Sequence, residues 1–164
     1  MVRPVLRYPD RRLKSPAVPI RRPGPAARRL AEDLRDTAQA HRRTVGLAAP
    51  QIGVLLRMVF IDCTGHPRAP GARGPLWLVD PVLVAAEGAE VGREGCLSLP
   101  DITANVRRAT RIRVRALDLD GRARVLEARG FEARVILHEM DHLDGILILD
   151  RVASLQLDVF PRRR

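Results

Sequence analysis

The segment His138-Glu139-Met140-Asp141-His142 most constrains this chain, because it places two histidines four residues apart with a glutamate beside the first. On an α-helix, residues i and i+4 lie one turn apart on the same face, so both imidazoles can bind one metal ion. Glu139 lies about 100° further round the helix than His138. Its carboxylate would be next to the metal without coordinating it, which suits a general base acting on metal-bound water.

The residues around this segment predict a helix. Gly130 can begin it and Gly145 can end it. Apolar residues occur on most sides of the helix axis, at Phe131, Val135, Ile136, Leu137, Met140 and Leu143. On so apolar a helix the two histidines could also be ordinary core residues. A catalytic metal site needs a third protein ligand and one open coordination position.

No third ligand follows the helix. The extended protease pattern H-E-x-x-H-x-x-G-x-x-H is matched as far as Gly145, but Ile148 stands where the third histidine should be. Residues 143–164 also contain no glutamate. The upstream candidate is Cys96, in a short segment that suggests a tight, exposed turn. A thiolate with two imidazoles leaves one coordination position for water, and such a site is sensitive to oxidation if the metal is ferrous iron.

Length and charge limit the classes of protein to consider. A chain of 164 residues has the size of one domain, and we expect residues 152–164 to be a short, frayed basic tail. The net charge is +10, and Lys14 is the only lysine, so the positive charge is nearly all arginine. These arginines are scattered and have no aromatic interleaving, so no specific nucleic-acid site is evident. Weak affinity for RNA, including the ribosome, is compatible with the charge.

Neither a secretory signal nor a membrane span is predicted. The first ten residues carry charges and prolines but no apolar stretch, and no segment contains 18 consecutive apolar residues. We therefore expect a cytoplasmic protein with no membrane partner. In such a compartment Cys63 and Cys96 should be reduced thiols rather than a disulfide.

Strand patterns precede the apolar helix. We expect one N-terminal helix over residues 26–41, an irregular segment over 44–51, and irregular backbone between Pro100 and Thr110. The predicted strands are residues 54–62, 76–79, 82–85, 110–119 and 123–128, with Pro81 dividing the second from the third and a hairpin turn at 118–122. This order predicts an α+β fold, with mostly antiparallel strands and hairpins wrapped around a central C-terminal helix that carries H-E-x-x-H.

Three blocks of sequence together resemble a known family. They are Gly46-Leu47-Ala48-Ala49-Pro50-Gln51, Glu94-Gly95-Cys96-Leu97-Ser98 and the H-E-x-x-H segment. In order and spacing they resemble the three signature motifs of peptide deformylases, over nearly the whole chain. The resemblance implies a hydrolase that removes the N-formyl group from the initiator methionine of new polypeptides. It also implies one divalent metal, natively Fe²⁺ and replaceable by Ni²⁺, Co²⁺ or Zn²⁺, bound by Cys96, His138 and His142.

The resemblance also implies roles for other residues. Glu139 would take a proton from the metal-bound water and pass it to the leaving amine, while the Gln51 side chain and the Leu97 N–H would stabilise the oxyanion. The partners would be N-formylmethionyl nascent peptides, whose backbone would pair with the regions of Gly46 and Gly95. For the pocket of the methionine side chain we expect Val45, Leu97 and Val135. A transient ribosome contact is compatible with this activity.

Four positions depart from the usual pattern of that family. Thr44 stands in place of a glycine, Asp80 in place of an asparagine, Thr103 in place of an arginine found in some members, and Leu137 in place of a glutamine. None of them is a metal-ligand or acid–base position. We therefore expect activity, with rate and peptide preference as the properties that could differ.

Two other functions are compatible with the residues alone. A metallopeptidase of the H-E-x-x-H class would explain the helix, but the downstream ligand is missing and Cys96 would have no role. A basic RNA- or ribosome-binding module with a structural metal would explain the charge. Structural zinc sites usually have four protein ligands, however, and nothing in the spacing of Cys63 favours it as the fourth.

Overall fold

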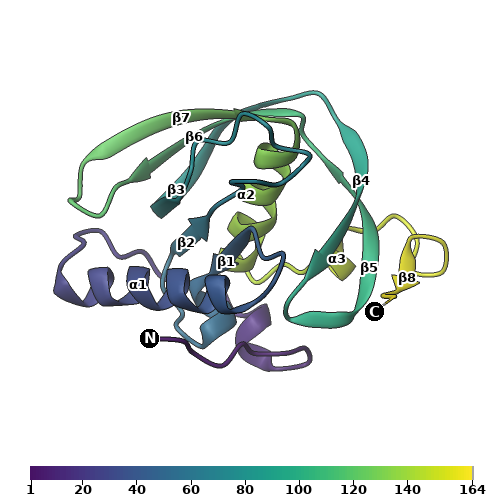
Figure 1. Ribbon diagram of the computed structural model, residues 1–164, viewed down its shortest axis with the longest axis horizontal. Helices are drawn as coiled ribbons and strands as arrows, with labels where there is room; N and C mark the ends of the chain where they lie inside the picture. Colours follow the sequence, from purple (N-terminus) through teal and green to yellow (C-terminus); the bar gives the residue numbers. More distant parts are fainter. Residues whose placement is uncertain (164) are drawn as a thin grey trace.

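The helix that carries H-E-x-x-H, α2 (Gly130–Leu143), lies between two antiparallel sheets (Figure 1). The structure is a computed structural model that describes residues 1–163. The two glycines that were predicted to bound this helix have positive φ, 58° at Gly130 and 71° at Gly145. A side chain at Gly145 would also lie 2.6 Å from the Lys14 carbonyl oxygen, so glycine is required there for close packing as well as for backbone conformation.

The larger sheet has the strand order β1-β2-β3-β6-β7, with every neighbouring pair antiparallel. Its strands are β1 (Gly46–Ala48), β2 (Met58–Ile61), β3 (Leu76–Glu87), β6 (Arg111–Leu117) and β7 (Ala123–Arg129). The predicted hairpin turn joins β6 to β7, where the Asp118 N–H donates to the Arg122 carbonyl over 2.9 Å. The predicted α+β class is confirmed.

Both faces of the interior strand β2 are covered: all four of its residues are buried, and successive side chains of a strand point to opposite faces. Val59 and Ile61 belong to the core that packs on α2. Met58 and Phe60 belong to a second core, which packs on α1 (Pro25–Ala40), the predicted N-terminal helix. The Trp77 Nε1–H group also donates to the Ala31 carbonyl over 2.9 Å, which ties α1 to the sheet.

The smaller sheet, β4-β5-β8, corrects two predictions. Its strands are β4 (Glu90–Cys96), β5 (Leu99–Arg108) and β8 (Val159–Pro161), and α3 (Ile148–Arg151) precedes β8. The backbone between Pro100 and Thr110 is therefore mostly strand rather than irregular. The prediction of a frayed tail is also wrong for β8. This strand pairs with residues 102–104 of β5, and Val159 packs on the apolar core of this sheet. Long-range pairing orders a segment that has no local signal of its own.

Three further boundaries differ from prediction. Of the strand predicted over residues 54–62, only the later part, β2, is strand. The segment 44–51, which was predicted to be irregular, contains β1 and the start of a 3₁₀ helix, η2 (Ala49–Ile52). Pro81 does not divide β3, because a register shift between Val79 and Val82 accommodates it within the strand. Asp80 has φ 50°, and its carboxylate accepts the N–H groups of Ile20 and Arg21 over 2.8 and 2.7 Å. Within residues 1–163, none of the helices has the length and apolar character needed to span a membrane.

Candidate metal centre

The three predicted metal ligands come together on two elements. Cys96 ends β4, and His138 and His142 lie one turn apart on α2. Their donor atoms all lie within 4.8 Å of one another, and Cys96 Sγ is 3.4 Å from His142 Nε2. The turn after Cys96 was predicted to be exposed, but the thiol is buried, since Cys96 belongs to the apolar core that also contains Leu13 and Leu147.

The chemistry of this group fits a divalent metal ion. Burial opposes ionisation of Cys96, but His142 and His138 outweigh it and hold the pKa of the thiol well below its usual range. A thiolate and two imidazoles are borderline-to-soft ligands for a transition metal. Among residues 1–163, no further histidine, cysteine or carboxylate joins the group, so a coordination position is left open. Cys63 lies in the apolar core, and both cysteines are free, as predicted.

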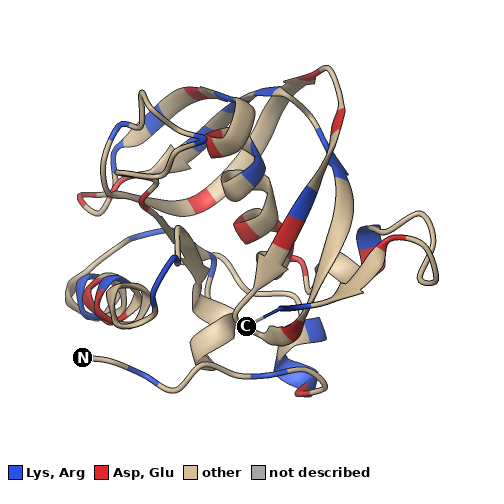
Figure 2. Cartoon of the chain, turned by 45° about the vertical axis from the view of Figure 1, so that its right-hand side comes forward, with Lys and Arg blue, Asp and Glu red and all other residues tan. Residues whose placement is uncertain are grey.

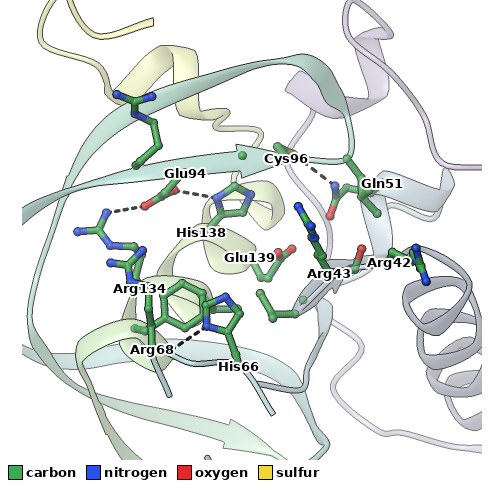
Figure 3. Close-up of a pocket in the computed structure, with 18 of the residues that line it drawn as sticks. Arg42, Arg43, Gln51, His66, Arg68, Glu94, Cys96, Arg134, His138 and Glu139 are labelled. Carbon is green, nitrogen blue, oxygen red and sulfur yellow. Dashed lines mark hydrogen bonds and ion pairs between the residues drawn. The ribbon is translucent and has the colours of Figure 1, made fainter. Parts of the chain in front are cut away.

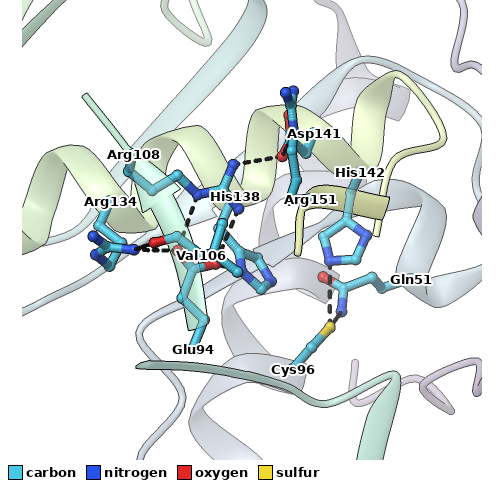
Figure 4. A network of polar contacts seen from close by, with 10 residues as sticks. All are labelled: Gln51, Glu94, Cys96, Val106, Arg108, Arg134, His138, Asp141, His142 and Arg151. Carbon is cyan, nitrogen blue, oxygen red and sulfur yellow. Dashed lines mark hydrogen bonds and ion pairs between the residues drawn. The ribbon is translucent and has the colours of Figure 1, made fainter. Parts of the chain in front are cut away.

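Glu94 orients the first histidine (Figure 4). Its Oε1 lies 2.8 Å from His138 Nδ1, which leaves Nε2 of that ring for the metal. Arg108 donates to both carboxylate oxygens over 2.9 Å, and Arg134 donates to Oε2 over 2.8 Å. Burial opposes ionisation of Glu94, but the hydrogen bonds with His138 and Arg108 hold its pKa below the usual range. Glu94 was predicted only as part of a signature block, and this role was missed.

The same network continues to the middle of the H-E-x-x-H segment. The Asp141 carboxylate accepts from Arg108 over 2.5 Å and from Arg151 over 2.8 Å. Arg108 and Asp141 are buried and Arg151 is exposed, and each of these charges has an opposite charge at hydrogen-bonding distance. Removal of one partner from such a network typically costs about 3–5 kcal/mol. The sequence carries no local signal for these pairs, since they join residues on α2, α3, β4 and β5.

Glu139 faces the cavity with an open hydrogen-bonding position (Figure 3). The side chain is 5% exposed, and its Oε2 has no hydrogen-bond partner among the described residues. Burial is the largest cause that raises the pKa of this carboxyl. Gly46 lies against it so closely that a Cβ there would be 2.8 Å from Glu139 Cγ. A carboxylate held in this way is available to a molecule in the cavity.

Gln51 presents its amide nitrogen to the site. Its Oε1 accepts the Ala48 N–H over 3.0 Å, which fixes the orientation of the amide. Nε2 then points toward β4, where it lies 3.2 Å from Ser98 Oγ and 3.6 Å from Cys96 Sγ. Leu97 follows in the turn between β4 and β5, and no described residue accepts a hydrogen bond from its N–H. Two donors, the Gln51 amide and the Leu97 N–H, therefore adjoin the thiolate.

A cavity of about 320 Å³ opens onto these groups. All the residues predicted to contact substrate line it, namely Val45, Gly46, Gly95, Leu97 and Val135, and so does Thr44. Phe131 lines it as well, with the His66 ring stacked on it at 4.1 Å between ring centroids. His66 is half-buried on the cavity wall. Its loop position gave no sign of this contact.

Known proteins resemble this chain over most of its length. The sequence model of the polypeptide deformylase family matches residues 2–158. The peptide deformylase of Thermomicrobium roseum is 45% identical over 152 residues, which cover 92% of this chain and 86% of that protein. The peptide deformylase of Alkalilimnicola ehrlichii is 44% identical over 152 residues, with 93% and 83% covered. The Met-Ala-Ser-bound structure of the class I type b peptide deformylase from Acinetobacter baumannii has a TM-score of 0.85 and 33% identity, and the match covers 93% of this chain and 99% of that chain.

The chain belongs to the peptide deformylase family. It is a hydrolase that removes formyl groups from polypeptides, as the three signature blocks predicted, and this activity belongs to protein biosynthesis. Peptide deformylases depend on a metal, and Cys96, His138 and His142 form a group that can hold one. Neither the metallopeptidase nor the RNA-binding alternative is favoured.

The four positions at which this chain departs from the family pattern have different surroundings in the fold. Thr44 lines the cavity, and Asp80 anchors the segment before α1. Thr103 lies on β5 opposite Gly95, with its hydroxyl 3.4 Å from Arg93. Leu137 is half-buried against the core beneath the larger sheet. None of the four interrupts the group of metal ligands.

Proposed function

We propose that this peptide deformylase acts on N-formylmethionyl nascent peptides with one divalent cation, natively Fe²⁺, held by Cys96, His138 and His142. Ni²⁺, Co²⁺ or Zn²⁺ could replace it. The observation that carries the proposal is the convergence of these three donors within 4.8 Å, beside a buried carboxylate with an open hydrogen-bonding position. When bound, such a cation lowers the pKa of a coordinated water and polarises a carbonyl.

Glu139 is the proposed general base and acid. Its elevated pKa makes it a better proton acceptor than an exposed glutamate, which suits proton transfer near neutral pH. The carboxylate would take the proton released by the attacking water and give it to the amine of the departing methionine. The contact with Gly46 keeps the side chain next to the ligands during both transfers.

Gln51 and Leu97 are the proposed oxyanion donors. Attack on the formyl carbon puts negative charge on the former carbonyl oxygen, and donors already aimed at that charge need no reorganisation. The Ala48 N–H holds the Gln51 amide in the orientation that makes Nε2 a donor to the site. The Leu97 N–H is held by the tight turn between β4 and β5.

Two free strand edges support the proposed binding of the peptide backbone. β1 is the edge strand of the larger sheet and β4 is an edge strand of the smaller one, and both contribute residues to the cavity. An extended peptide can therefore pair with the regions of Gly46 and Gly95 by strand addition. The methionine side chain would enter the apolar part of the cavity, beside Val45, Leu97 and Val135. The Acinetobacter relative was crystallised with Met-Ala-Ser, the peptide that deformylation of formyl-Met-Ala-Ser would leave.

We further propose that residues 1–164 act as one catalytic domain in the cytoplasm, because residues of both sheets and α2 surround one cavity. Substrates of this kind emerge from the ribosome, and the net charge of +10 supports a transient contact with it.

Formate release from formyl-Met-Ala-Ser tests the mechanism, with protein prepared anaerobically with iron or reconstituted with nickel. We expect formate from the wild type and almost none from Glu139→Ala, which keeps all three ligands and should bind metal in the same ratio. Cys96→Ser should lose metal and activity together. If folded, fully metallated Glu139→Ala kept its rate, the assignment of Glu139 as general base would be refuted.

A further inference from the structure

The mouth of the cavity is lined by exposed arginines. Lys and Arg are spread over many parts of the chain (Figure 2). At the cavity, arginines form a group that we call the arginine rim, made up of Arg42, Arg43, Arg68, Arg93 and Arg162. Arg42 and Arg43 lie on the side of Gln51, and Arg68 lies on the side of His66 (Figure 3). Among residues 1–163, the only carboxylates that line the cavity are Glu94 and Glu139, and both are buried.

No carboxylate of residues 1–163 forms an ion pair with the arginine rim. Glu94 already accepts hydrogen bonds from Arg108 and Arg134, and Glu139 faces the metal ligands. The rim is therefore uncompensated positive charge around an opening, in contrast to the buried network behind it.

Several members of the rim are nevertheless held in place by other contacts. The Arg93 guanidinium lies 3.6 Å above the Phe160 ring, and that of Arg68 lies 4.9 Å above the Phe131 ring. β8 brings Arg162 against Gly95, where a Cβ would lie 3.3 Å from its guanidinium carbon. Side chains that are ordered before a ligand arrives lose less conformational entropy on binding.

The rim lies where the peptide beyond the methionine would pass. Arg43 is three residues before Gly46 along the edge that leads into β1, and Arg93 is two residues before Gly95 on β4. An extended peptide advances about 3.3 Å per residue, so residues two and three of the substrate would lie about 3–7 Å beyond the methionine. We propose, on the basis of the proposed function, that the arginine rim makes this enzyme prefer formyl-methionyl peptides with Asp or Glu at positions two and three.

A peptide fits this arrangement better than RNA does. The five arginines come from four separate parts of the chain and surround one opening of a 320 Å³ cavity. An RNA duplex would need phosphate contacts along an extended surface, whereas an extended peptide that enters the cavity places its side chains among all five.

The test compares kcat/KM for three amidated peptides, formyl-Met-Asp-Glu, formyl-Met-Asn-Gln and formyl-Met-Lys-Lys. Asn and Gln match the shapes of Asp and Glu without their charge. An exposed charge pair typically changes binding by about 1.5- to 5-fold, so two acidic residues should raise kcat/KM about 2- to 25-fold over the amide peptide. The lysine peptide should be slower than the amide peptide, and the preference should shrink between about 50 and about 500 mM NaCl.

The variant Arg42→Gln/Arg43→Gln should lower the ratio of the acidic to the amide peptide several-fold. Arg21→Gln/Arg22→Gln is a matched control. Like Arg42 and Arg43, these are adjacent exposed arginines, one of each pair has positive φ, and neither forms an ion pair within the described part of the chain. Unlike the rim pair, they do not line the cavity. The ratio of this control should equal that of the wild type. A second variant, Arg93→Gln/Arg162→Gln, tests the opposite side of the mouth.

Activity on the amide peptide reports on the proposed function, and the ratio alone reports on the rim, so the two can fail separately. A wild type that cleaves the acidic and amide peptides equally well would overturn the rim proposal. So would an unchanged ratio in both rim variants. If these variants kept the ratio but lost affinity for ribosomal RNA, the rim would be an RNA contact and the proposal would be wrong.

Discussion

Replacement of Gly46 by alanine tests whether the position of Glu139 determines the rate. The added Cβ would lie 2.8 Å from Glu139 Cγ and 2.9 Å from Oε1. Ordinary carbon–carbon contacts are about 3.5–4.0 Å, so either β1 or the Glu139 side chain must move by about 0.7–1.2 Å. The side chain is only 5% exposed and has little room to move without disturbing the ligands on both sides.

A displacement of about 1 Å in a catalytic group can cost about 100-fold in rate, or about 2.7 kcal/mol of transition-state stabilisation. We therefore expect kcat for formyl-Met-Ala-Ser to fall about 100-fold in Gly46→Ala. Metal content should stay at the wild-type ratio, because no ligand is changed.

Gly71→Ala is the matched control, since nothing lies within 4 Å of a Cβ at that position. It should keep wild-type kcat and thermal stability. The reasoning would be refuted if folded, metallated Gly46→Ala had a kcat within about threefold of the wild type. A loss of metal in step with activity would instead show that the contact supports the ligands rather than Glu139.

Three further predictions concern the surroundings of the site. Glu94→Gln weakens the acceptor for His138 and removes one of the two carboxylates that compensate buried Arg108, so metal affinity measured by chelator competition should fall about 10- to 100-fold. Urea unfolding should show a loss of about 3–5 kcal/mol, and wild-type stability would contradict the account of the network. Cys63 is 1% exposed, and burial, with Glu132 and Asp62, raises the pKa of its thiol to about 12. It should resist alkylation at about pH 8 until the chain unfolds. Because the unfolded thiol ionises above about pH 8.5 while the folded one keeps its proton, its contribution to stability is complete below that pH. It falls by up to about 1.4 kcal/mol per pH unit toward pH 12, and rapid alkylation of folded protein would refute its burial. Trp77→Phe removes the hydrogen bond to the Ala31 carbonyl and should lower the free energy of unfolding by about 1 kcal/mol, whereas an unchanged melting temperature would show that this bond adds nothing.

The sequence by itself determined the helix of the site and the three candidate ligands. The spacing of His138 and His142 is a property of any helix, and the glycines that bound α2 are local signals of the kind that sequence reveals. Cys96 and Gln51 could be found because the three blocks occur in one order, although no local rule places them near the helix. In the structure, Gln51 Nε2 and the ligands adjoin as the resemblance implied.

Only the tertiary structure decided how these groups are held. The interaction of Glu94 with His138, the charge network through Arg108 and Asp141, and the contact between Gly46 and Glu139 each join segments far apart in the chain. The same is true of β8, which sequence alone predicted to be frayed. Local spacing fixes which side chains share one face of one element, whereas contacts between elements depend on register and packing across the whole fold. The candidate ligands could therefore be predicted from the sequence, and the surroundings that orient them could not.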